Sequence, residues 1–324
     1  MILTELAALA GVSVGTVSKA FSGSREISEA TRERICEVAR EAGVFEKYHK
    51  GRFPKPVIAV ICPEIGSNYY SSIVSMLRSR IEADGGIALI CETGFDRAKE
   101  TELFSYFSGY NGADGVILFT PGTKHNNPTH FPAVSIGGAH ESANMDVICL
   151  KLENAIEDAL EYLKKTGHGS IGFAGEKLTQ SKLDQFRSAM RRAGLPVEAR
   201  HVKTSPNRFE QAGVDCAEAW LREGDLPDAI LAAYDYIAIG IIKTLHDHGV
   251  RVPEDVSVIG MDDITTAPYL ETSLSSIRTN TEEACQRAVE LIMIKTKNQY
   301  YMDRQKIVIQ SEFIPRESSG PRSK

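Results

Sequence analysis

Few cysteines occur in this chain of 324 residues, and their spacing argues against two kinds of stabilising site. The six are scattered and none forms a Cys-x-x-Cys pair; they are Cys36, Cys62, Cys91, Cys149, Cys216 and Cys285. Disulfide-framed domains and zinc sites both need closer and more regular cysteine spacing. We therefore expect buried, reduced thiols in a cytoplasmic protein, with no disulfide framework and no metal site.

Long apolar runs are missing as well. No run reaches the roughly 20 residues that span a bilayer, and the first residues lack the charged and apolar segments of a signal peptide. The composition, 42% hydrophobic and 25% charged, is that of ordinary globular proteins. We expect two or three globular domains and no membrane partner.

The common motifs of catalysis and nucleotide binding are also absent from the sequence. It contains no G-x-x-x-x-G-K-[ST] phosphate loop, no G-x-G-x-x-G opening a helix and no G-x-S-x-G nucleophile turn. His246 and His248 are two residues apart on a predicted helix, so their side chains do not face each other. Asp262 and Asp263 follow a predicted strand without a companion cluster, which favours binding of a ligand hydroxyl or amine over metal or acid–base chemistry. We expect no catalytic residue and no cofactor.

The first positive pattern lies at the N-terminus. Apolar residues recur at helical spacing on both sides of Gly11, as Leu6, Ala7 and Ala10 before it and Val14, Val17 and Phe21 after it. Gly11 suits the end of one helix and Ser13 the start of a second, and a third is predicted from Ser28 to Gly43. The pattern predicts a helix-turn-helix whose second helix can enter a DNA major groove. Short helix–Gly–helix patterns also occur in other helical proteins, so it leaves DNA binding open.

Charge is distributed unevenly along the chain. The net charge is −6, but residues 1–56 hold nine Lys or Arg against seven Glu. Basic residues cluster in a segment that glycine and two prolines mark as a boundary, residues 46–56. Such a run is usually a solvated connector, but beside a helix-turn-helix it is equally suited to contact phosphate.

Apolar β-branched runs alternate with helical patterns from residue 57 onward. Strands are predicted at 57–62, 87–91, 115–119, 133–136, 170–174, 199–203, 229–232 and 256–260. Helices are predicted at 69–84, 97–109, 153–165, 180–193, 208–223 and 235–248. This alternation predicts an α/β core with doubly wound parallel sheets, divided into two lobes near residues 150–153. A further helix at 281–297 and a strand at 306–310 could join either lobe.

These patterns resemble the lac repressor (LacI/GalR) family of bacterial transcription regulators. The segment 6–19 reads Leu-Ala-x-x-Ala-Gly-Val-Ser-x-x-Thr-Val-Ser-Lys, and residues 249–263 carry the long specific run GVRVPEDVSVIGMDD. The resemblance covers residues 3–316 and implies a periplasmic-binding-protein-like core of two lobes. It implies a headpiece at 1–45, a basic hinge at 46–56, an N-subdomain at 57–152 and 281–300, and a C-subdomain at 153–280 and 301–316. The polar tail 317–324 is predicted to be disordered.

The resemblance implies that the headpiece reads a near-palindromic double-stranded DNA operator. Base-reading positions fall on Val14, Gly15 and Lys19, and phosphate-contacting or capping positions on Ser13, Thr16 and Ser18. The family's hinge pattern Pro-Asn-x-x-Ala-x-x-Leu is missing, so we expect a linker that grips phosphate through Lys47, Lys50 and Arg52. The family implies a homodimer or tetramer, and the lack of a heptad-bearing tail favours the homodimer.

Effector positions carry over onto loops that follow the strands, where ligands bind in open α/β sheets. They are Tyr69, Tyr70, Lys182, Arg208, Tyr234 and Asp262. Lys182 replaces the usual arginine and Tyr234 a common asparagine, while Lys151-Leu152 replaces a usual Asp-Asn. The effector is expected to be a sugar or an anionic sugar-like metabolite, and Lys182 and Arg208 together favour the anionic one.

The leading interpretation is therefore a ligand-responsive transcription regulator, most often a repressor in this family. Two alternatives remain open at this point, a solute-binding protein of the transport class and an enzyme with an α/β core. The N-terminal headpiece argues against the first, and the absence of a catalytic pattern argues against the second. Removing residues 1–56 would distinguish them, because only the regulator would lose DNA binding.

Overall fold

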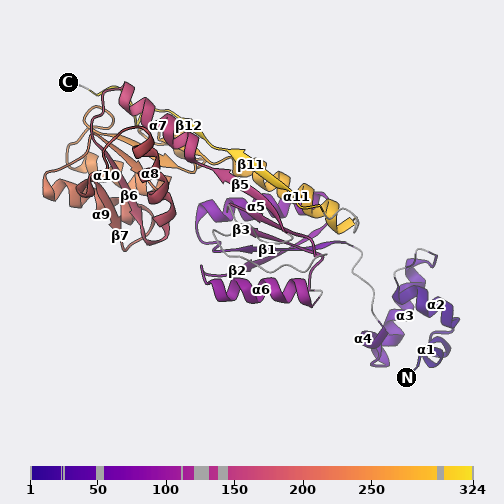
Figure 1. The fold of residues 1–324 in the computed structure, drawn as a ribbon. Helices are drawn as coiled ribbons and strands as arrows, with labels where there is room; N and C mark the ends of the chain where they lie inside the picture. Colours follow the sequence, from indigo (N-terminus) through magenta and orange to yellow (C-terminus); the bar gives the residue numbers. More distant parts are fainter. Residues whose placement is uncertain are drawn as a thin grey trace. The chain divides into compact units, whose positions relative to one another are not determined.

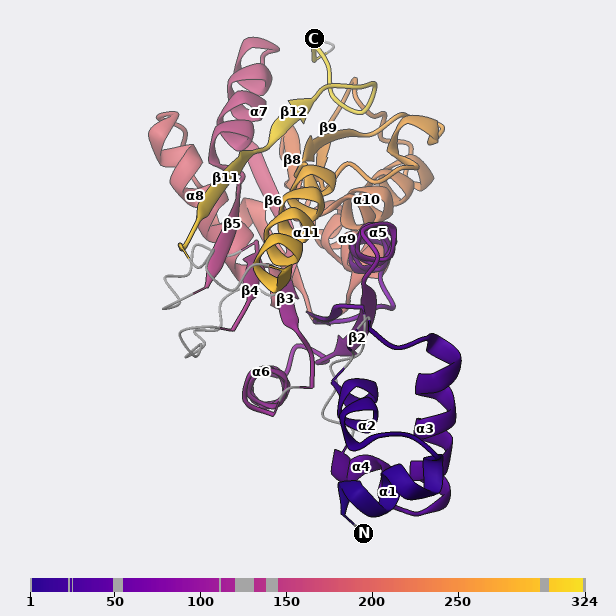
Figure 2. The same cartoon turned by 90° about the vertical axis from the view of Figure 1, so that its right-hand side faces the viewer.

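The computed structural model describes residues 2–22, 24, 26–48, 55–110, 112–119, 131–137, 145–297 and 303–322. The chain forms two compact units, a headpiece and a core, which Figures 1 and 2 show from two directions. The headpiece unit comprises Met1–Val57 with Gly85–Ile87, and the core unit comprises Ile58–Asp84 and Ala88–Lys324. Within the described ranges, no helix has the length and apolar character needed to cross a membrane.

The headpiece is a helix-turn-helix with a third helix packed across it. Its three main helices are α1 (Leu3–Ala10), α2 (Val14–Phe21) and α3 (Glu29–Glu41). Gly11 adopts a left-handed φ of 64° and ends α1, and the Ser13 hydroxyl accepts a hydrogen bond from the Thr16 amide at 3.1 Å to begin α2. Leu6, Val17 and Ile35, one from each helix, are fully buried together. The sequence prediction for this region is confirmed.

The headpiece extends further than the sequence suggested. A short helix, α4 (Phe45–Tyr48), brings two aromatic rings to within about 6 Å of the Phe21 ring. The Arg40 guanidinium also lies 4.5 Å from the Phe45 ring centroid. Burial of these rings outweighs the polar composition of the segment, so the predicted boundary at residue 45 is too early. Lys47 is exposed on α4, whereas the predicted hinge residues Lys50 and Arg52 lie outside the described residues.

The N-terminal lobe of the core is a six-stranded sheet in the order β11-β5-β4-β3-β1-β2. Its strands are β1 (Val57–Cys62), β2 (Ile87–Glu92), β3 (Gly115–Phe119), β4 (Ala133–Ile136), β5 (Asp146–Lys151) and β11 (Lys306–Gln310). Figure 1 shows α5 (Asn68–Ala83) and α11 (Thr281–Lys297) on one face and α6 (Arg97–Gly109) on the other. Because strand side chains alternate, Ile58 and Val60 pack toward α5 and α11, and Ala59 and Ile61 toward α6. Cover on both faces explains the unbroken apolar run of β1.

The C-terminal lobe is a second six-stranded sheet in the order β12-β10-β9-β8-β6-β7. Its strands are β6 (Ile171–Glu176), β7 (Val202–Ser205), β8 (Ala229–Ala232), β9 (Ser257–Met261), β10 (Ser275–Arg278) and β12 (Glu312–Ile314). The four long helices around it are α7 (Glu153–Lys165), α8 (Gln180–Arg192), α9 (Phe209–Glu223) and α10 (Asp235–Asp247). Phe173, Phe186 and Trp220 are fully buried in one continuous apolar core. Neighbouring strands of this sheet run parallel, except that β12 pairs antiparallel with β10.

Two assignments at the C-terminal end need correction. The strand at 306–310 was placed in the C-subdomain, but β11 pairs in parallel with β5 of the N-terminal lobe, from Lys306 beside Val147 to Gln310 beside Lys151. The third passage between the lobes therefore lies between β11 and β12. The return of α11 to the N-terminal lobe is as predicted. Strands β5, β10 and β12 were not predicted.

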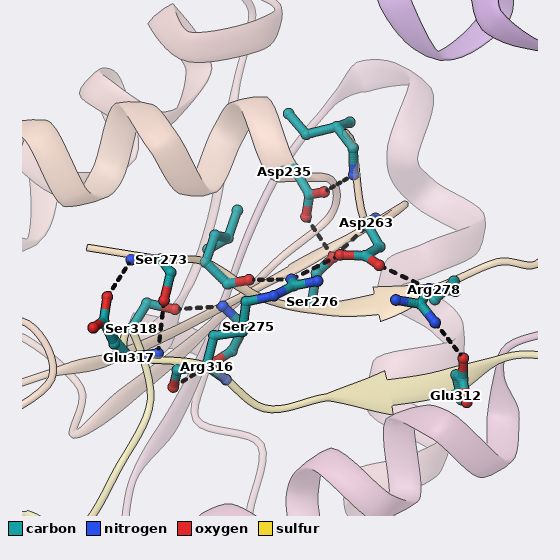
Figure 3. Close-up of polar contacts among 12 residues, drawn as sticks. Asp235, Asp263, Ser273, Ser275, Ser276, Arg278, Glu312, Arg316, Glu317 and Ser318 are labelled. Carbon is teal, nitrogen blue, oxygen red and sulfur yellow. Dashed lines mark hydrogen bonds and ion pairs between the residues drawn. The ribbon is translucent and has the colours of Figure 1, made fainter. Parts of the chain in front are cut away.

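The tail after residue 316 is also ordered, against the prediction of disorder. Ser318 is fully buried, and its hydroxyl accepts from the Ser275 amide at 2.8 Å (Figure 3). The same hydroxyl donates to the Val258 carbonyl at 2.6 Å. The Val258 amide in turn donates to the Ser318 carbonyl at 2.7 Å. Serine hydroxyls that bond to neighbouring strands make this polar segment part of the C-terminal lobe, as far as Gly320.

Candidate functional site

The recognition helix α2 exposes a narrow face of small side chains and one lysine. Val17, Ala20 and Phe21 are buried in the headpiece core, so the opposite face carries Val14, Gly15, Ser18 and Lys19. Val14 is 39% exposed although it is apolar. A Cβ on Gly15 would meet only the Ser13 hydroxyl, at 3.7 Å, so packing within the headpiece does not require glycine there. Glycine at this position instead allows an external surface to approach the helix backbone closely.

Ser13 and Thr16 face each other at the start of α2. Their hydroxyl oxygens lie 2.8 Å apart, and the Ser13 oxygen also accepts the Thr16 amide. The predicted alternative role as a cap is therefore confirmed for Ser13, while Thr16 supplies the amide that is capped. Ser18 is exposed one turn later.

Lys19 does not stand alone on the exposed face. Its ammonium group donates to the carboxylate of Glu26, which lies beyond the C-terminal end of α2. The hydrogen bond and the positive charge of Lys19 lower the pKa of Glu26. The two side chains are 47% and 69% exposed, and an exposed pair of this kind adds little to stability. Lys19 can therefore exchange Glu26 for another negatively charged or acceptor group at small cost.

The core contains a cavity of about 520 Å³ between its two lobes. All six predicted effector residues line it, namely Tyr69, Tyr70, Lys182, Arg208, Tyr234 and Asp262. Five parallel strands, one from the N-terminal lobe and four from the C-terminal lobe, end at this cavity, since the residues follow β1, β6, β7, β8 and β9. The carboxyl-end rule for open α/β sheets thus accounts for their convergence.

Arg208 is held by carboxylates from both lobes. Its Nη1 and Nη2 atoms donate to the two oxygens of Glu64 at 2.8 and 3.0 Å, and its Nε lies 3.4 Å from Glu176. The guanidinium also lies 4.4 Å from the Phe209 ring centroid. The hydrogen bonds from Arg208 lower the pKa of Glu64, and those carboxylates raise the pKa of Arg208. Glu64 and Glu176 were not predicted as site residues.

Tyr234 and Glu176 form the next polar contact along the cavity wall. The Tyr234 hydroxyl donates to Glu176 Oε1 at 2.8 Å and accepts from the Phe209 amide at 3.1 Å. Burial raises the pKa of Tyr234, so the phenol stays protonated. The Glu176 side chain is only 2% exposed, and these donors give the buried carboxylate its hydrogen-bond partners.

Lys182 and Asp262 form a second ion pair in the cavity. The Lys182 ammonium donates to the Ala233 carbonyl at 2.7 Å and lies 3.3 Å from Asp262 Oδ1. The Asp262 side chain is 8% exposed, and burial raises its pKa while Lys182 opposes the shift. Both cations singled out from the sequence therefore already have acidic partners.

Apolar and aromatic side chains supply the remaining walls. The rings of Tyr69 and Tyr70 lie 6.1 and 5.6 Å from the Phe119 ring, and burial raises the pKa of both tyrosines. Leu150 and Leu152 line the cavity where β5 passes into α7. The cavity therefore combines flat aromatic surfaces with paired acidic and basic groups.

Asp263, next to Asp262, binds the strands that connect the lobes (Figure 3). One carboxylate oxygen accepts from Arg278 of β10 at 2.8 Å, and the other lies 2.7 Å from Arg316, which follows β12. Asp262 and Asp263 both have positive φ, at 100° and 51°, a conformation that non-glycine residues adopt only when their surroundings enforce it. This strained turn directs one carboxylate to the cavity and the next to the connecting strands.

Asp235 lies beside the same turn and is fully buried (Figure 3). Its two oxygens accept from the Ser276 hydroxyl at 2.6 Å and the Ile264 amide at 2.7 Å. A Cβ on Gly260 would lie 2.1 Å from Asp235 Oδ1, so glycine leaves room for the carboxyl group. Burial, together with the nearby charge of Asp262, raises the pKa of Asp235 to about 8.

The Asp235→Asn variant should remove a pH dependence of stability. Since the folded-state pKa is about 8 and the unfolded value about 3.9, the folded state keeps a proton that the unfolded state loses. The stabilisation is complete below about pH 4 and is lost as the pH rises to about 8, by up to about 1.4 kcal/mol per pH unit. Urea unfolding of both proteins from pH 5 to 9 measures the difference, with the exposed Asp184→Asn as control. Parallel pH profiles for wild type and Asp235→Asn would contradict the assignment.

Metal and redox sites find no support among the residues whose positions are described. No cluster of three or more His, Cys, Asp or Glu side chains there could hold a metal ion. Five of the six cysteines are buried and Cys91 is half-buried. Burial raises the pKa of Cys216 and of Cys285 to about 12, which makes both thiols unreactive near neutral pH.

Two family patterns match this chain. Residues 2–44 match "Bacterial regulatory proteins, lacI family", and residues 160–319 match "Periplasmic binding protein-like domain". The HTH-type transcriptional regulator DegA of Bacillus subtilis is 26% identical over 336 residues, which covers 98% of this chain and 97% of that protein. The HTH-type transcriptional repressor CytR of Escherichia coli is 26% identical over 92% of this chain and 90% of its own length.

Solved structures share the fold over the whole chain. The transcriptional regulator CelR in complex with cellobiose matches with a TM-score of 0.67 and 24% identity, over 98% of this chain and 99% of its own. The lac repressor dimer bound to operator and the anti-inducer ONPF matches with a TM-score of 0.72 and 20% identity, over 98% of both chains. The helix-turn-helix and the two-lobed core thus occur together in proteins of known structure.

Proposed function

Because this chain belongs to the LacI family of bacterial regulatory proteins, whose members are DNA-binding regulators and not enzymes, we propose that it is a ligand-responsive repressor. Its headpiece binds a specific operator in double-stranded DNA, and a small molecule in the core cavity changes the operator affinity. The observation that carries this proposal is the exposed face of α2, with Val14, Gly15 and Lys19 on a capped helix-turn-helix. This activity places the protein in the cytoplasm, with the DNA.

We propose that α2 reads the major groove with few side chains. Lys19 leaves Glu26 and donates to an acceptor on a base edge, for which guanine is the usual partner. Val14 contacts a thymine methyl group, and Gly15 lets the helix backbone approach the bases. Ser13, Thr16 and Ser18 contact phosphates, and Lys47, Lys50 and Arg52 extend that contact along the backbone. This allocation rests on the exposure of α2 and on the sequence of the linker.

We further propose that two copies of the chain bind a near-palindromic operator as a homodimer. A protein with twofold symmetry presents two recognition helices in opposite orientations, so each reads one half-site. The likeness to the lac repressor dimer bound to operator supports this arrangement.

The effector is proposed to be a small polyhydroxylated, sugar-like molecule in the 520 Å³ cavity. Aromatic surfaces and alternating acids and bases can stack against a ring and bond to its hydroxyl groups. The cavity lies between lobes that the chain connects three times. A ligand that binds one arrangement of the lobes more tightly therefore increases the population of that arrangement. Asp263 provides a physical connection between the cavity and the segments that join the lobes. It is adjacent to Asp262, which lines the cavity, and it binds two of those segments.

The DNA-binding proposal is tested by selecting operator sites with the purified full-length protein from a random duplex pool. We expect enrichment of an inverted repeat. A Lys19→Ala variant should then bind the selected site more weakly by about 1–3 kcal/mol, because one base contact is lost. Fluorescence anisotropy at fixed salt measures this change.

Lys165→Ala is the matched control for Lys19→Ala. Lys165 is an exposed lysine on α7 that pairs with Glu161, as Lys19 pairs with Glu26, so both variants lose one charge and one surface ion pair. We expect Lys165→Ala to retain wild-type affinity. Equal losses in the two variants, or no enriched sequence at all, would refute operator reading by α2.

A further inference from the structure

The charges that line the core cavity are balanced. The basic side chains are Arg97, Lys177, Lys182 and Arg208, and the acidic ones are Glu64, Glu100, Glu176 and Asp262. Lys182 and Arg208 are both paired with acidic side chains within the cavity. An added anion would therefore meet a neutral set of groups and not a positively charged pocket.

Glu64 binds the guanidinium group of Arg208 in the same way that the carboxylate of a ligand would. Its two oxygens accept from Nη1 and Nη2, which is the bidentate arrangement preferred by arginine and carboxylates. Glu176 takes the remaining edge of the guanidinium at Nε. Both edges of the guanidinium group that could bind the carboxylate of a ligand therefore already have partners.

Displacement of Glu64 by an anionic ligand would be unfavourable. The Glu64 side chain is only 13% exposed, so its charge would remain in a partly dry cavity without its main partner. Three carboxylates would then surround one guanidinium, counting the ligand, Glu64 and Glu176. The exchange would also remove a contact between the lobes, because Glu64 follows β1 and Arg208 precedes α9.

We propose that Glu64 is a specificity-determining residue that fills the anion-binding side of Arg208 and restricts the cavity to effectors without net negative charge. This inference rests on the proposed function, in which the cavity binds an effector. It reverses the sequence-based expectation of an anionic metabolite, which counted Lys182 and Arg208 as available cations. Removing the Glu64 charge should convert the same cavity into an anion site.

Calorimetric titration of the full-length protein with inorganic phosphate and with malonate tests the proposal. We expect Glu64→Gln to bind at least one of these anions about tenfold or more tightly than wild type, because the freed guanidinium gains a charge-assisted partner. The gain should disappear in the double variant Glu64→Gln with Arg208→Gln. That variant also corrects for anion binding elsewhere, including at the headpiece.

Glu161→Gln is the matched control for the change in net charge, since Glu161 is an exposed glutamate on α7. Circular dichroism melting checks that each variant is folded, and Glu64→Ala carries the same expectation if Glu64→Gln does not fold. No gain over wild type, or a gain that persists in the double variant, would overturn the proposal. The assay uses neither DNA nor the natural effector, so its result stands apart from the operator selection.

Discussion

Replacing Lys295 by methionine should lower the free energy of unfolding by about 3–5 kcal/mol, because it leaves a buried carboxylate without its cation. Lys295 lies on α11 and is 6% exposed, and its ammonium nitrogen is 2.8 and 2.7 Å from the two oxygens of Asp146. The Asp146 side chain is fully buried at the start of β5 and also accepts from the Gln305 amide just before β11. The ion pair thus joins three elements that are distant in sequence but adjacent in the N-terminal lobe.

Lys297→Met is the control for this prediction. Lys297 is on the same helix but exposed, so the same change in charge and side-chain shape should alter stability by less than about 0.5 kcal/mol. Chemical unfolding followed by circular dichroism gives both values. A loss below about 1 kcal/mol for Lys295→Met would mean that water or another group compensates Asp146.

Gly240→Ala is expected to force α9 and α10 apart. A Cβ at residue 240 would lie 2.0 Å from the Glu210 carbonyl oxygen, and one at Gly213 would lie 2.1 Å from the Ile237 carbonyl oxygen. Each helix therefore has a glycine where the backbone of the other passes, and neither backbone can yield easily. Overpacking of this kind costs about 1–3 kcal/mol, and occasionally more, in a well-packed core.

The same substitution should disturb the cavity, since Arg208 and Tyr234 stand at the starts of α9 and α10. The bond from the Phe209 amide to the Tyr234 hydroxyl spans the two helices and should weaken. Thermal melting and intrinsic fluorescence of Trp220, buried in α9, would report both effects. Gly109→Ala at the open end of α6, with no atom within 4 Å of the added Cβ, should leave stability almost unchanged. Comparable melting of the two variants would contradict the close-packing argument.

Much of the fold could be predicted from local patterns. Helices α6, α7 and α11 begin and end at the predicted residues, because their apolar spacing and flanking residues define them without reference to the rest of the chain. Strands β1 and β3 were equally clear, since both faces are covered and the runs are wholly apolar.

Two of the three missed strands, β10 and β12, are short or polar. β10 reads Ser-Ser-Ile-Arg, and its two serines are buried because their hydroxyls bond to the tail and to Asp235. β12 has three residues, and its partner in the sheet lies in a distant part of the sequence. Such pairings depend on tertiary contacts that no local pattern encodes.

The sequence predicted which residues line the candidate site, but not how their charges are paired. The strand-end rule and the family resemblance together identified six side chains that line one cavity. The ion pair of Arg208 with Glu64 joins residues 144 positions apart, so it could not be inferred from spacing. Glu176 left a weak signal, as an acid at the carboxyl end of a buried strand, where a ligand site is expected. The Arg208–Glu64 ion pair, which is evident only in the folded chain, changed the expected ligand from an anion to a molecule without net negative charge.

The late position of α11 and β11 has a consequence for biosynthesis. A chain made from its N-terminus can fold the headpiece early, since the four helices described for it are complete by residue 48. The N-terminal lobe lacks α11 and β11 until the ribosome has translated nearly the whole C-terminal lobe, and until then the apolar side chains of β4 and β5 have no cover from α11. We therefore expect the headpiece of a nascent chain to be able to bind DNA well before the core can bind a ligand.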